Sequence, residues 1–243
     1  MSSVTEHYDN HLAPIYTWMA GGVEAAIARG RAEVQAVCPR AAPSRRAVDL
    51  GAGFGMHAIP LADIGYSVLA IDSSGALLDV LKTQAGTRTI VTVQDDLRAF
   101  GKHLDAPAAL FMCMGDTLTH LPDRPSVVRL FADVAQTLVE DGLFVVTFRD
   151  YSSTIVGPQR FIPVRSDSNR ILTCFLEYED DTVMVHDVVH ERDGAEWRQR
   201  VSAYRKLRLS PEWTIRALEA AGLDVVREQG LAGMVRLIAR PAH

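Results

Sequence analysis

Arg46-Ala-Val-Asp-Leu-Gly-Ala-Gly-Phe-Gly-Met56 is the stretch that decides the fold of this chain. Its apolar residues up to Leu50 predict a short buried strand. Glycines then follow at every second position: Gly51, Gly53 and Gly55. Glycine tolerates positive φ and has no Cβ, so the backbone can turn sharply and lie against a ligand. A helix is expected from Gly55 to Ile64, and its free N–H groups and positive dipole end would point toward the same ligand.

The spacing of the glycines indicates the class of ligand. A dinucleotide-binding loop carries Gly-x-Gly-x-x-Gly, whereas here residue 56 is Met and the third glycine falls one position early. This spacing disfavours a NAD-linked oxidoreductase, which is kept as an alternative. The pattern Asp49-x-Gly-x-Gly-x-Gly resembles motif I of the class I methyltransferases that use S-adenosylmethionine (SAM). The resemblance implies that the loop, with Ala52, lies under the methionine and ribose portions of SAM and that Asp49 helps to position it.

Acidic residues end the next two predicted strands. Asp72 closes the strand that begins at Tyr66, where a carboxylate in such folds accepts hydrogen bonds from ribose hydroxyls. The alternative for Asp72 is a helix N-cap for the segment that begins at Ser73. The third strand, residues 88–94, ends in Asp95-Asp96-Leu97. The resemblance implies that one of these acids meets the adenine amino group beside an apolar side chain; either acid fits, and a solvated turn is the alternative. The cofactor residues predicted in this way are Tyr16, Asp49, Gly51, Ala52, Gly53, Gly55, Asp72, Ser73, Asp95, Asp96, Leu97 and Met114.

The fourth strand delivers the predicted acceptor site. Residues 107–113 form a continuous apolar run, typical of a strand covered on both faces. The loop after it, Gly115-Asp-Thr-Leu-Thr-His-Leu121, resembles that of glycine and sarcosine N-methyltransferase-like enzymes, with Asp116 in place of the more usual Asn. The sequence lacks the Asn/Asp-Pro-Pro-aromatic motif of amino-methylating DNA and protein enzymes, and the paired-glutamate loop of protein arginine methyltransferases.

These features predict an enzyme that transfers a methyl group from SAM to a small polar acceptor and releases S-adenosylhomocysteine (SAH). His120 and Asp116 are expected to take the acceptor's proton. Arg149 is expected to bind an anionic group of the acceptor, and Tyr151 to complete the pocket. The favoured acceptor is an amine with an anionic group, methylated on nitrogen or oxygen. The alternatives are structural roles for Asp116 and His120, a surface salt bridge at 149–151, and a non-catalytic SAM/SAH sensor or scaffold.

The flanking segments predict a cap and a lid. Residues 1–40 are expected to form a helical cap, in which an aromatic segment at 5–20 covers the cofactor; Tyr16 would line the cationic sulfonium, or else the helix packs on the sheet edge. Residues 152–208 contain four alternating runs separated by turn signals, which predict an antiparallel sheet, and the resemblance implies that this insert is a substrate lid. Residues 41–151 and 209–243 are the expected core, an α/β Rossmann-like seven-stranded sheet. The resemblance implies the strand order 3-2-1-4-5-7-6, with strand seven antiparallel.

Composition limits the remaining possibilities. The chain has 243 residues, 48% of them hydrophobic, and a formal charge of −5, which disfavours nucleic acid as a partner. Its three cysteines are far apart and predict no disulfide framework, so a reducing, cytoplasmic location is expected. No apolar run predicts a membrane span, and the expected state is monomer or homodimer. His186 and His190 would lie about 13 Å apart on one strand, too far for one metal ion, so no metal site is predicted.

Overall fold

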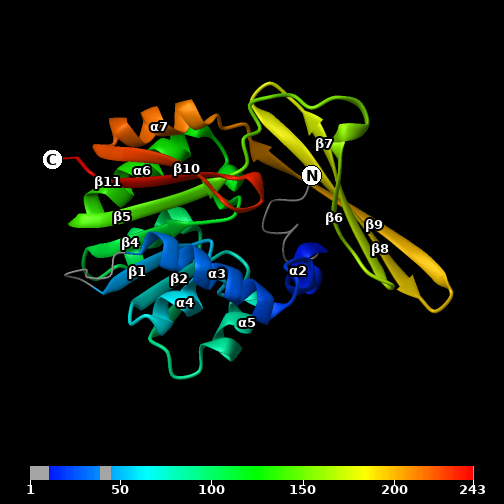
Figure 1. Cartoon of the computed structure of the whole chain (residues 1–243), viewed down its shortest axis with the longest axis horizontal. Coiled ribbons are helices and arrows are strands. Elements are labelled where there is room, and N and C mark those ends of the chain that lie inside the picture. The colour runs from blue at the N-terminus through cyan, green and yellow to red at the C-terminus, as the bar shows by residue number, and fades with distance from the viewer. Residues whose placement is uncertain (1–10, 39–44, 243) are drawn as a thin grey trace.

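The computed structural model describes residues 11–38 and 45–242, which form two separate sheets (Figure 1). The part of the predicted aromatic segment before residue 11 and the expected cap–core junction near residue 40 lie outside the described residues. Within the described ranges, no helix combines the length and the apolarity needed to cross a membrane.

The larger sheet has the predicted topology. Its strands are β1 (Arg46–Leu50), β2 (Ser67–Asp72), β3 (Ile90–Gln94), β4 (Ala108–Cys113), β5 (Leu138–Phe148), β10 (Leu223–Gln229) and β11 (Val235–Pro241). They are arranged in the order β10-β11-β5-β4-β1-β2-β3. Strands β1 to β5 pair in parallel, and β11 is antiparallel to both of its neighbours. The expected order with an antiparallel seventh strand is therefore confirmed.

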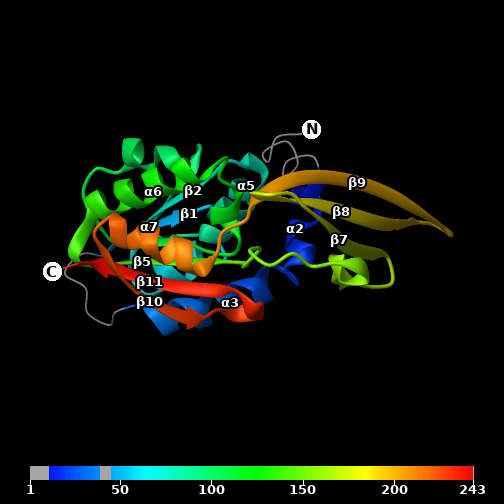
Figure 2. The ribbon, with the colours of Figure 1, turned by 90° about the horizontal axis from the view of Figure 1, so that it is seen from above.

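Helices cover both faces of this sheet (Figures 1 and 2). They are α3 (Val23–Val37), α4 (Ala58–Asp63) and α5 (Gly75–Ala85) on one face, and α6 (Arg124–Thr137) and α7 (Pro211–Ala220) on the other. Because side chains alternate along a strand, Val48 and Phe111 pack under α6 and α7, whereas Ala47 and Met112 pack under α3, α4 and α5. This double burial explains the unbroken apolar runs of β1 and β4.

Two element boundaries differ from the sequence prediction. The helix after the glycine loop begins only at Ala58, because Gly55 adopts φ +94°, which a right-handed helix does not accommodate. The pair Asp141-Gly142 predicts a turn that leads into a fifth strand starting at residue 143, but β5 begins at Leu138 and contains this pair. It pairs with β4 in two registers, which places the irregularity inside the strand instead of before it.

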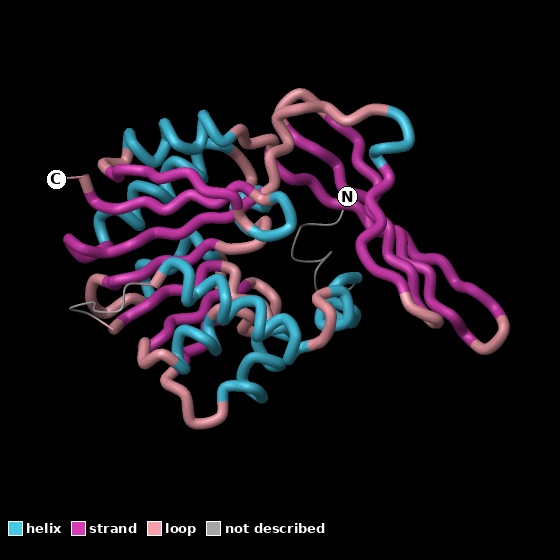
Figure 3. Tube along the Cα trace, viewed as in Figure 1, coloured by secondary structure: helices cyan, strands magenta, loops and turns pink. Residues whose placement is uncertain are grey.

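The insert after β5 forms the smaller, four-stranded antiparallel sheet, which extends away from the core (Figure 3). Its strands are β6 (Phe161–Ser166), β7 (Arg170–Tyr178), β8 (Thr182–Asp193) and β9 (Glu196–Leu207), preceded by the 3₁₀ segment η4 (Gly157–Arg160). The remaining 3₁₀ segments are η2 (Leu97–His103), η3 (Thr117–His120) and η5 (Leu231–Gly233). Helix α2 (Ala13–Met19) packs on this smaller sheet, where Leu12 and Ile15 meet Leu172 and Val189. The predicted antiparallel sheet is confirmed.

Candidate active site

A cavity of about 670 Å³ lies at the carboxyl edge of the larger sheet, where the core, α2 and the smaller sheet meet. One wall is the loop after β1, with Gly51, Ala52 and Gly53. The opposite side is formed by the segments that follow β4 and β5 and by side chains of β7, β8 and β9. Parallel strands bring the loops at their carboxyl ends to one edge, so the cavity occupies the position where folds of this topology bind ligands.

The three positions of the loop require glycine for different local reasons. Each adopts a positive φ: +77° at Gly51, +52° at Gly53 and +94° at Gly55. A Cβ on Gly51 would collide with the side chain of Thr117, and a Cβ on Gly55 would collide with that of Leu81. A Cβ on Gly53 would meet only Leu77 Cδ1, at 3.9 Å, and Gly53 itself lines the cavity. Gly51 and Gly55 therefore permit close packing, whereas Gly53 leaves room for a ligand.

Asp72 fixes the shape of this loop. Its Oδ2 accepts a hydrogen bond from the Gly53 N–H at 2.7 Å, and its Oδ1 accepts one from the Ser74 N–H at 2.8 Å. Ser74, rather than Asp72, is the N-cap of α5. The Asp95 N–H donates to the Asp72 carbonyl oxygen at 3.2 Å, so the acidic ends of β2 and β3 lie side by side. Ser73 lies in the same turn, where its carbonyl oxygen accepts a hydrogen bond from Gln94 Nε2.

The predicted adenine-binding residues are not among the described residues that line the cavity. Asp95 Oδ2 lies 2.8 Å from His103 Nε2, and the hydrogen bond from His103 lowers the pKa of Asp95. Asp96 is the N-cap of η2 and pairs with Arg98, whose hydrogen bonds lower the pKa of Asp96. Leu97 packs against the core cluster beneath α6 and α7. The adenine contact of Asp95 or Asp96 stays a prediction.

Asp49 is a buried acid behind the glycine loop. Its side chain is 1% exposed, and Oδ2 has no hydrogen-bond partner among the described residues. Burial raises the pKa of Asp49 to about 6, against the lowering effect of nearby His57. Burial makes the ionised form of Asp49 unfavourable. A buried carboxylate beside a ligand-binding loop therefore suits a site that receives a cation or a hydrogen-bond donor.

Asp116 is the centre of the acceptor side. Its Oδ1 accepts from the Arg149 backbone N–H at 3.0 Å. Its Oδ2 accepts from the Tyr151 hydroxyl at 2.9 Å and from Lys206 Nζ at 2.5 Å. Burial opposes ionisation, but the charge of Lys206 and these hydrogen bonds hold the pKa of Asp116 at about 2. Burial and the Asp116 charge raise the pKa of Tyr151 above its ordinary range, so its hydroxyl keeps the proton that it donates.

Lys206 is the site residue that the sequence analysis missed. It lies on β9 and is buried, with Nζ 5.5 Å from the ring centre of Tyr204 and 5.9 Å from that of Tyr151. Strand alternation places Tyr204 and Lys206 on the same face of β9. A single lysine in phase with the inward-facing residues of this strand is the sequence signal that would have identified it.

The predicted catalytic residues are only partly brought together. Asp116, Arg149 and Tyr151 line the cavity together with Met114, whereas His120 is not part of its described wall. His120 ends η3 and stacks on Tyr204, with ring centres 5.4 Å apart and an interplanar angle of 19°. Tyr204 lines the cavity, so the imidazole lies against a wall residue.

Tyr16 places α2 at the boundary between the glycine-loop side and the acceptor side of the cavity. Its ring packs edge-on against Phe54 of the glycine loop, with centroids 5.9 Å apart, and lines the cavity. Burial raises the pKa of Tyr16, and the charges of Asp72 and Asp116 raise it further while Lys206 lowers it. The hydroxyl is therefore within the field of groups from both walls.

The histidines considered for a metal are engaged elsewhere. His186 Nε2 lies 2.5 Å from Glu177 Oε2, and His190 Nε2 lies 3.2 Å from Gln199 Nε2. Among the residues that the structure describes, no group of three or more His, Cys, Asp or Glu side chains is arranged to hold a metal ion.

Comparison with known proteins places these features in context. Residues 47–142 match a family model described as a methyltransferase domain. A glycine/sarcosine N-methyltransferase from Aphanothece halophytica is 28% identical over 111 residues, which cover 44% of this chain and 42% of that protein. The chain spans about two fifths of the length of the sequence relatives that it matches.

Solved structures resemble this chain over most of its length. The CcbJ methyltransferase from Streptomyces caelestis has a TM-score of 0.79 at 21% identity, over 97% of this chain and 98% of that one. The sugar N-methyltransferase KedS8 from Streptoalloteichus sp ATCC 53650 has a TM-score of 0.73 at 16% identity, over 95% and 92%. The glycopeptide N-methyltransferase MtfA, in complex with SAM, has a TM-score of 0.61 at 19% identity, over 89% and 87%. The expected fold is confirmed by these likenesses.

Proposed function

We propose that this chain, which has the fold of the class I SAM-dependent methyltransferases and a methyltransferase domain over residues 47–142, methylates a nitrogen or oxygen of a small polar acceptor and releases SAH. The proposal rests on one observation. A single cavity joins the open face of Gly53 to a wall that carries Asp116, Arg149, Tyr151 and Lys206. A methyl donor and its acceptor both fit such a two-sided space.

The glycine side suits SAM, which when bound supplies a methyl group already activated on a cationic sulfonium. Gly53 leaves open space where a side chain would obstruct the ligand. Asp72 lies at the carboxyl end of β2, where its carboxylate is placed to accept bonds from ribose hydroxyls. Tyr16 offers an aromatic face to a cation, and Ala52 and Met114 offer apolar contact. Asp49 contributes a buried negative charge behind the loop.

On the acceptor side, we assign Asp116 a positioning role. Its carboxylate accepts three hydrogen bonds and, with a pKa of about 2, stays ionised near neutral pH. It therefore holds the Tyr151 hydroxyl and the Lys206 ammonium at the cavity wall instead of exchanging a proton. His120, which is stacked on Tyr204, is the proposed proton acceptor. Positioning of this kind supplies roughly 7–11 kcal/mol when the reacting atoms are well aligned.

The wall suggests the chemistry of the acceptor. Arg149 is among the residues that line the cavity, and its guanidinium group suits a carboxylate or another anion. Ile162, Leu176 and Val185 from the smaller sheet add an apolar surface. An amine that carries an anionic group satisfies both features. In this proposal residues 1–40 form a cap, residues 41–151 and 209–243 the SAM-binding core, and residues 152–208 the substrate lid.

The test is formation of SAH by the purified protein incubated with SAM and a panel of small amines and alcohols. Mass spectrometry should detect SAH and an acceptor that is heavier by one methylene unit. Arg149→Ala should reduce kcat/KM for acidic acceptors more than for uncharged ones. Binding of SAM without SAH formation for any acceptor would instead favour a non-catalytic SAM sensor.

A further inference from the structure

Helix α2 contributes to the cavity but is fastened to the smaller sheet. Leu12 and Tyr16 line the cavity, and the turn to α3 passes through Gly21 and Gly22, which adopt φ +89° and +95°. The apolar face of α2 meets residues of the smaller sheet. Leu172 and Val189 are directly paired across β7 and β8, and beneath α2 they are 1% and 0% exposed.

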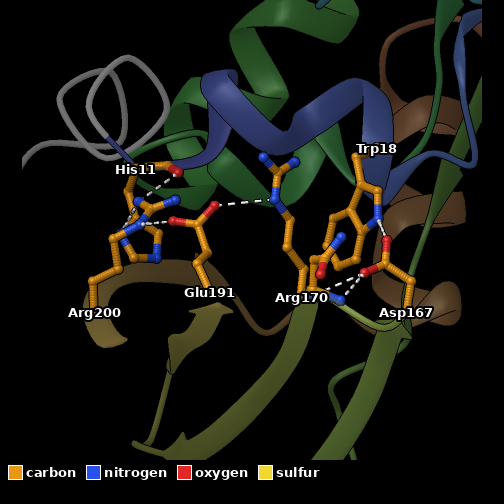
Figure 4. Close-up of polar contacts among 7 residues, drawn as sticks. His11, Trp18, Asp167, Arg170, Glu191 and Arg200 are labelled. Carbon is orange, nitrogen blue, oxygen red and sulfur yellow. Dashed lines mark hydrogen bonds and ion pairs between the residues drawn. The ribbon is translucent and has the colours of Figure 1, made fainter. Parts of the chain in front are cut away.

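Polar contacts also join the smaller sheet to the segment that runs from His11 to Trp18 (Figure 4). Glu191 forms ion pairs with two arginines: its Oε1 lies 3.1 Å from Arg170 Nε, and its Oε2 lies 2.9 Å from Arg200 Nε. Arg200 Nη1 in turn donates to the carbonyl oxygen of His11 at 3.2 Å. Glu191 thus orients the guanidinium group that holds the start of α2.

The other end of α2 is held in the same way. Trp18 Nε1 donates to Asp167 Oδ2 at 2.5 Å. The guanidinium carbons of Arg165 and Arg170 lie 5.7 Å and 5.8 Å from the centre of the Trp18 ring, within the range of cation–π attraction. Arg170 therefore contacts both Trp18 and Glu191, which joins the two ends into one network. Trp18, Asp167, Arg170, Glu191 and Arg200 are not among the described residues that line the cavity.

We propose that Glu191 is a positioning residue for cofactor binding: through Arg170 and Arg200 it fixes α2 to the smaller sheet, and α2 holds Tyr16 against Phe54 in the cavity. An insert residue outside the cavity thereby sets the affinity for SAM and SAH. The part of this inference that concerns ligand affinity rests on the proposed function. The part that concerns the attachment of α2 does not.

The test uses Glu191→Gln in the full chain, with Asp193→Asn as the matched control. Glutamine keeps the shape of Glu191 but removes its charge and one of its two acceptor oxygens. Asp193 is on the same strand and pairs with Arg198 at 2.7 Å, but both side chains are largely exposed. Trp18→Phe is a second variant, which keeps a ring between the arginines and removes the bond to Asp167.

Hydrogen exchange of the ligand-free protein provides the first measurement. Amides of Ile15 to Met19 should exchange about fivefold faster in Glu191→Gln and in Trp18→Phe, while β1 and β4 stay unchanged. Asp193→Asn should match the wild type throughout. Unchanged exchange of the α2 amides in both Glu191→Gln and Trp18→Phe would overturn the proposal, whether or not the protein binds SAH.

The second measurement is the affinity for SAH, determined by calorimetry. Glu191→Gln should raise the Kd for SAH by about threefold to tenfold and raise the KM for SAM, with kcat at saturating SAM within about twofold. In a Tyr16→Ala background the same change should alter Kd by less than about twofold, because the two residues act through one helix. An equal effect in both backgrounds would overturn the role of Tyr16. Absence of SAH binding by the wild type would instead overturn the proposed function.

Discussion

Lys206 Nζ lies 2.5 Å from Asp116 Oδ2, so the inward face of the smaller sheet is ion-paired to the loop after β4. Both side chains are about one tenth exposed. Removing one partner of such a pair leaves a buried charge uncompensated, which is more costly than losing an exposed pair. This contact joins the proposed lid to the proposed acceptor site.

Lys206→Met should therefore lower the free energy of unfolding at pH 7 by roughly 3–5 kcal/mol. The wild-type pKa of Asp116, about 2, is below the unfolded value, so its stabilisation is present above about pH 4 and is lost as pH falls toward 2. The stability difference between Lys206→Met and the wild type should be smaller at pH 3, because Asp116 without its lysine partner is neutral at that pH. Urea unfolding at both pH values measures this. The control, Lys82→Met, removes an exposed pair with Asp79 and should cost at most about 1 kcal/mol; equal losses in the two variants would contradict the prediction.

Asp49 predicts the opposite pH dependence. Its pKa in the folded state is about 6, above the unfolded value of about 3.9, so the folded state retains a proton that the unfolded state loses. Stability then falls as pH rises from about 4 to 6. Relative to the wild type, ligand-free Asp49→Asn should gain roughly 3 kcal/mol of stability between pH 4 and pH 7. A stability difference that does not vary with pH would refute the assignment.

Gly53→Ala should separate ligand binding from folding. Its new Cβ would meet no closer neighbour than Leu77 Cδ1 but would occupy the cavity, so SAH affinity should fall at least about tenfold. Gly65→Ala is the matched control, because Gly65 also has a positive φ, +91°, and open space around it but is not among the cavity residues. Both variants should lose a similar roughly 1–2 kcal/mol of stability. Calorimetry should show normal SAH affinity only for Gly65→Ala, and equal affinities would place the ligand elsewhere.

His120→Ala should lower kcat about a hundredfold, because a positioned base contributes that much to proton transfer. SAH affinity should stay within about twofold, since His120 is not among the cavity residues. His190→Ala, which changes a histidine bonded to Gln199 on the smaller sheet, is the control and should keep the wild-type kcat. A wild-type kcat in His120→Ala would rule out His120 as the base and leave solvent as the route for the proton.

Arg149→Ala should raise the KM of an acidic acceptor about tenfold and leave kcat nearly unchanged, as expected for a charge-assisted contact made equally in the ground state and the transition state. Arg149→Lys should recover part of the affinity, because it keeps the charge without the bidentate geometry. Steady-state kinetics at saturating SAM measures both variants. An equal KM in all three proteins would show that Arg149 does not bind the acceptor.

The features predictable from the sequence are those with local signals. The glycine spacing around Gly53, the acid at Asp72 and the apolar run of β4 each follow from neighbouring residues, whereas the strand order follows from the family resemblance that these residues carry. Ser210, followed by Pro211, is a local N-cap signal of the same kind, and its Oγ accepts from the Trp213 N–H at 3.1 Å. Boundaries near Gly55 and Asp141-Gly142 were less accurate, because glycine backbone angles and strand register are not visible in local patterns.

The features that were missed depend on contacts between distant parts of the chain. Asp116 and Lys206 are 90 residues apart, and Trp18 and Asp167 are 149 apart. The sequence indicates that these residues are polar or aromatic but does not show which of them meet. For the same reason His120, chosen for its place in the loop, proved to stack behind Tyr204, and the attachment of α2 to the smaller sheet was not foreseen.

The central claim is that the cavity binds SAM and presents its methyl group to a small acceptor. Titration calorimetry of the wild-type protein with SAM, SAH and NAD, each under the same conditions, tests it most directly. The account predicts saturable one-site heats for SAM and SAH and none for NAD, with both heats greatly weakened in Gly53→Ala. Heat from NAD with none from SAM or SAH would contradict it.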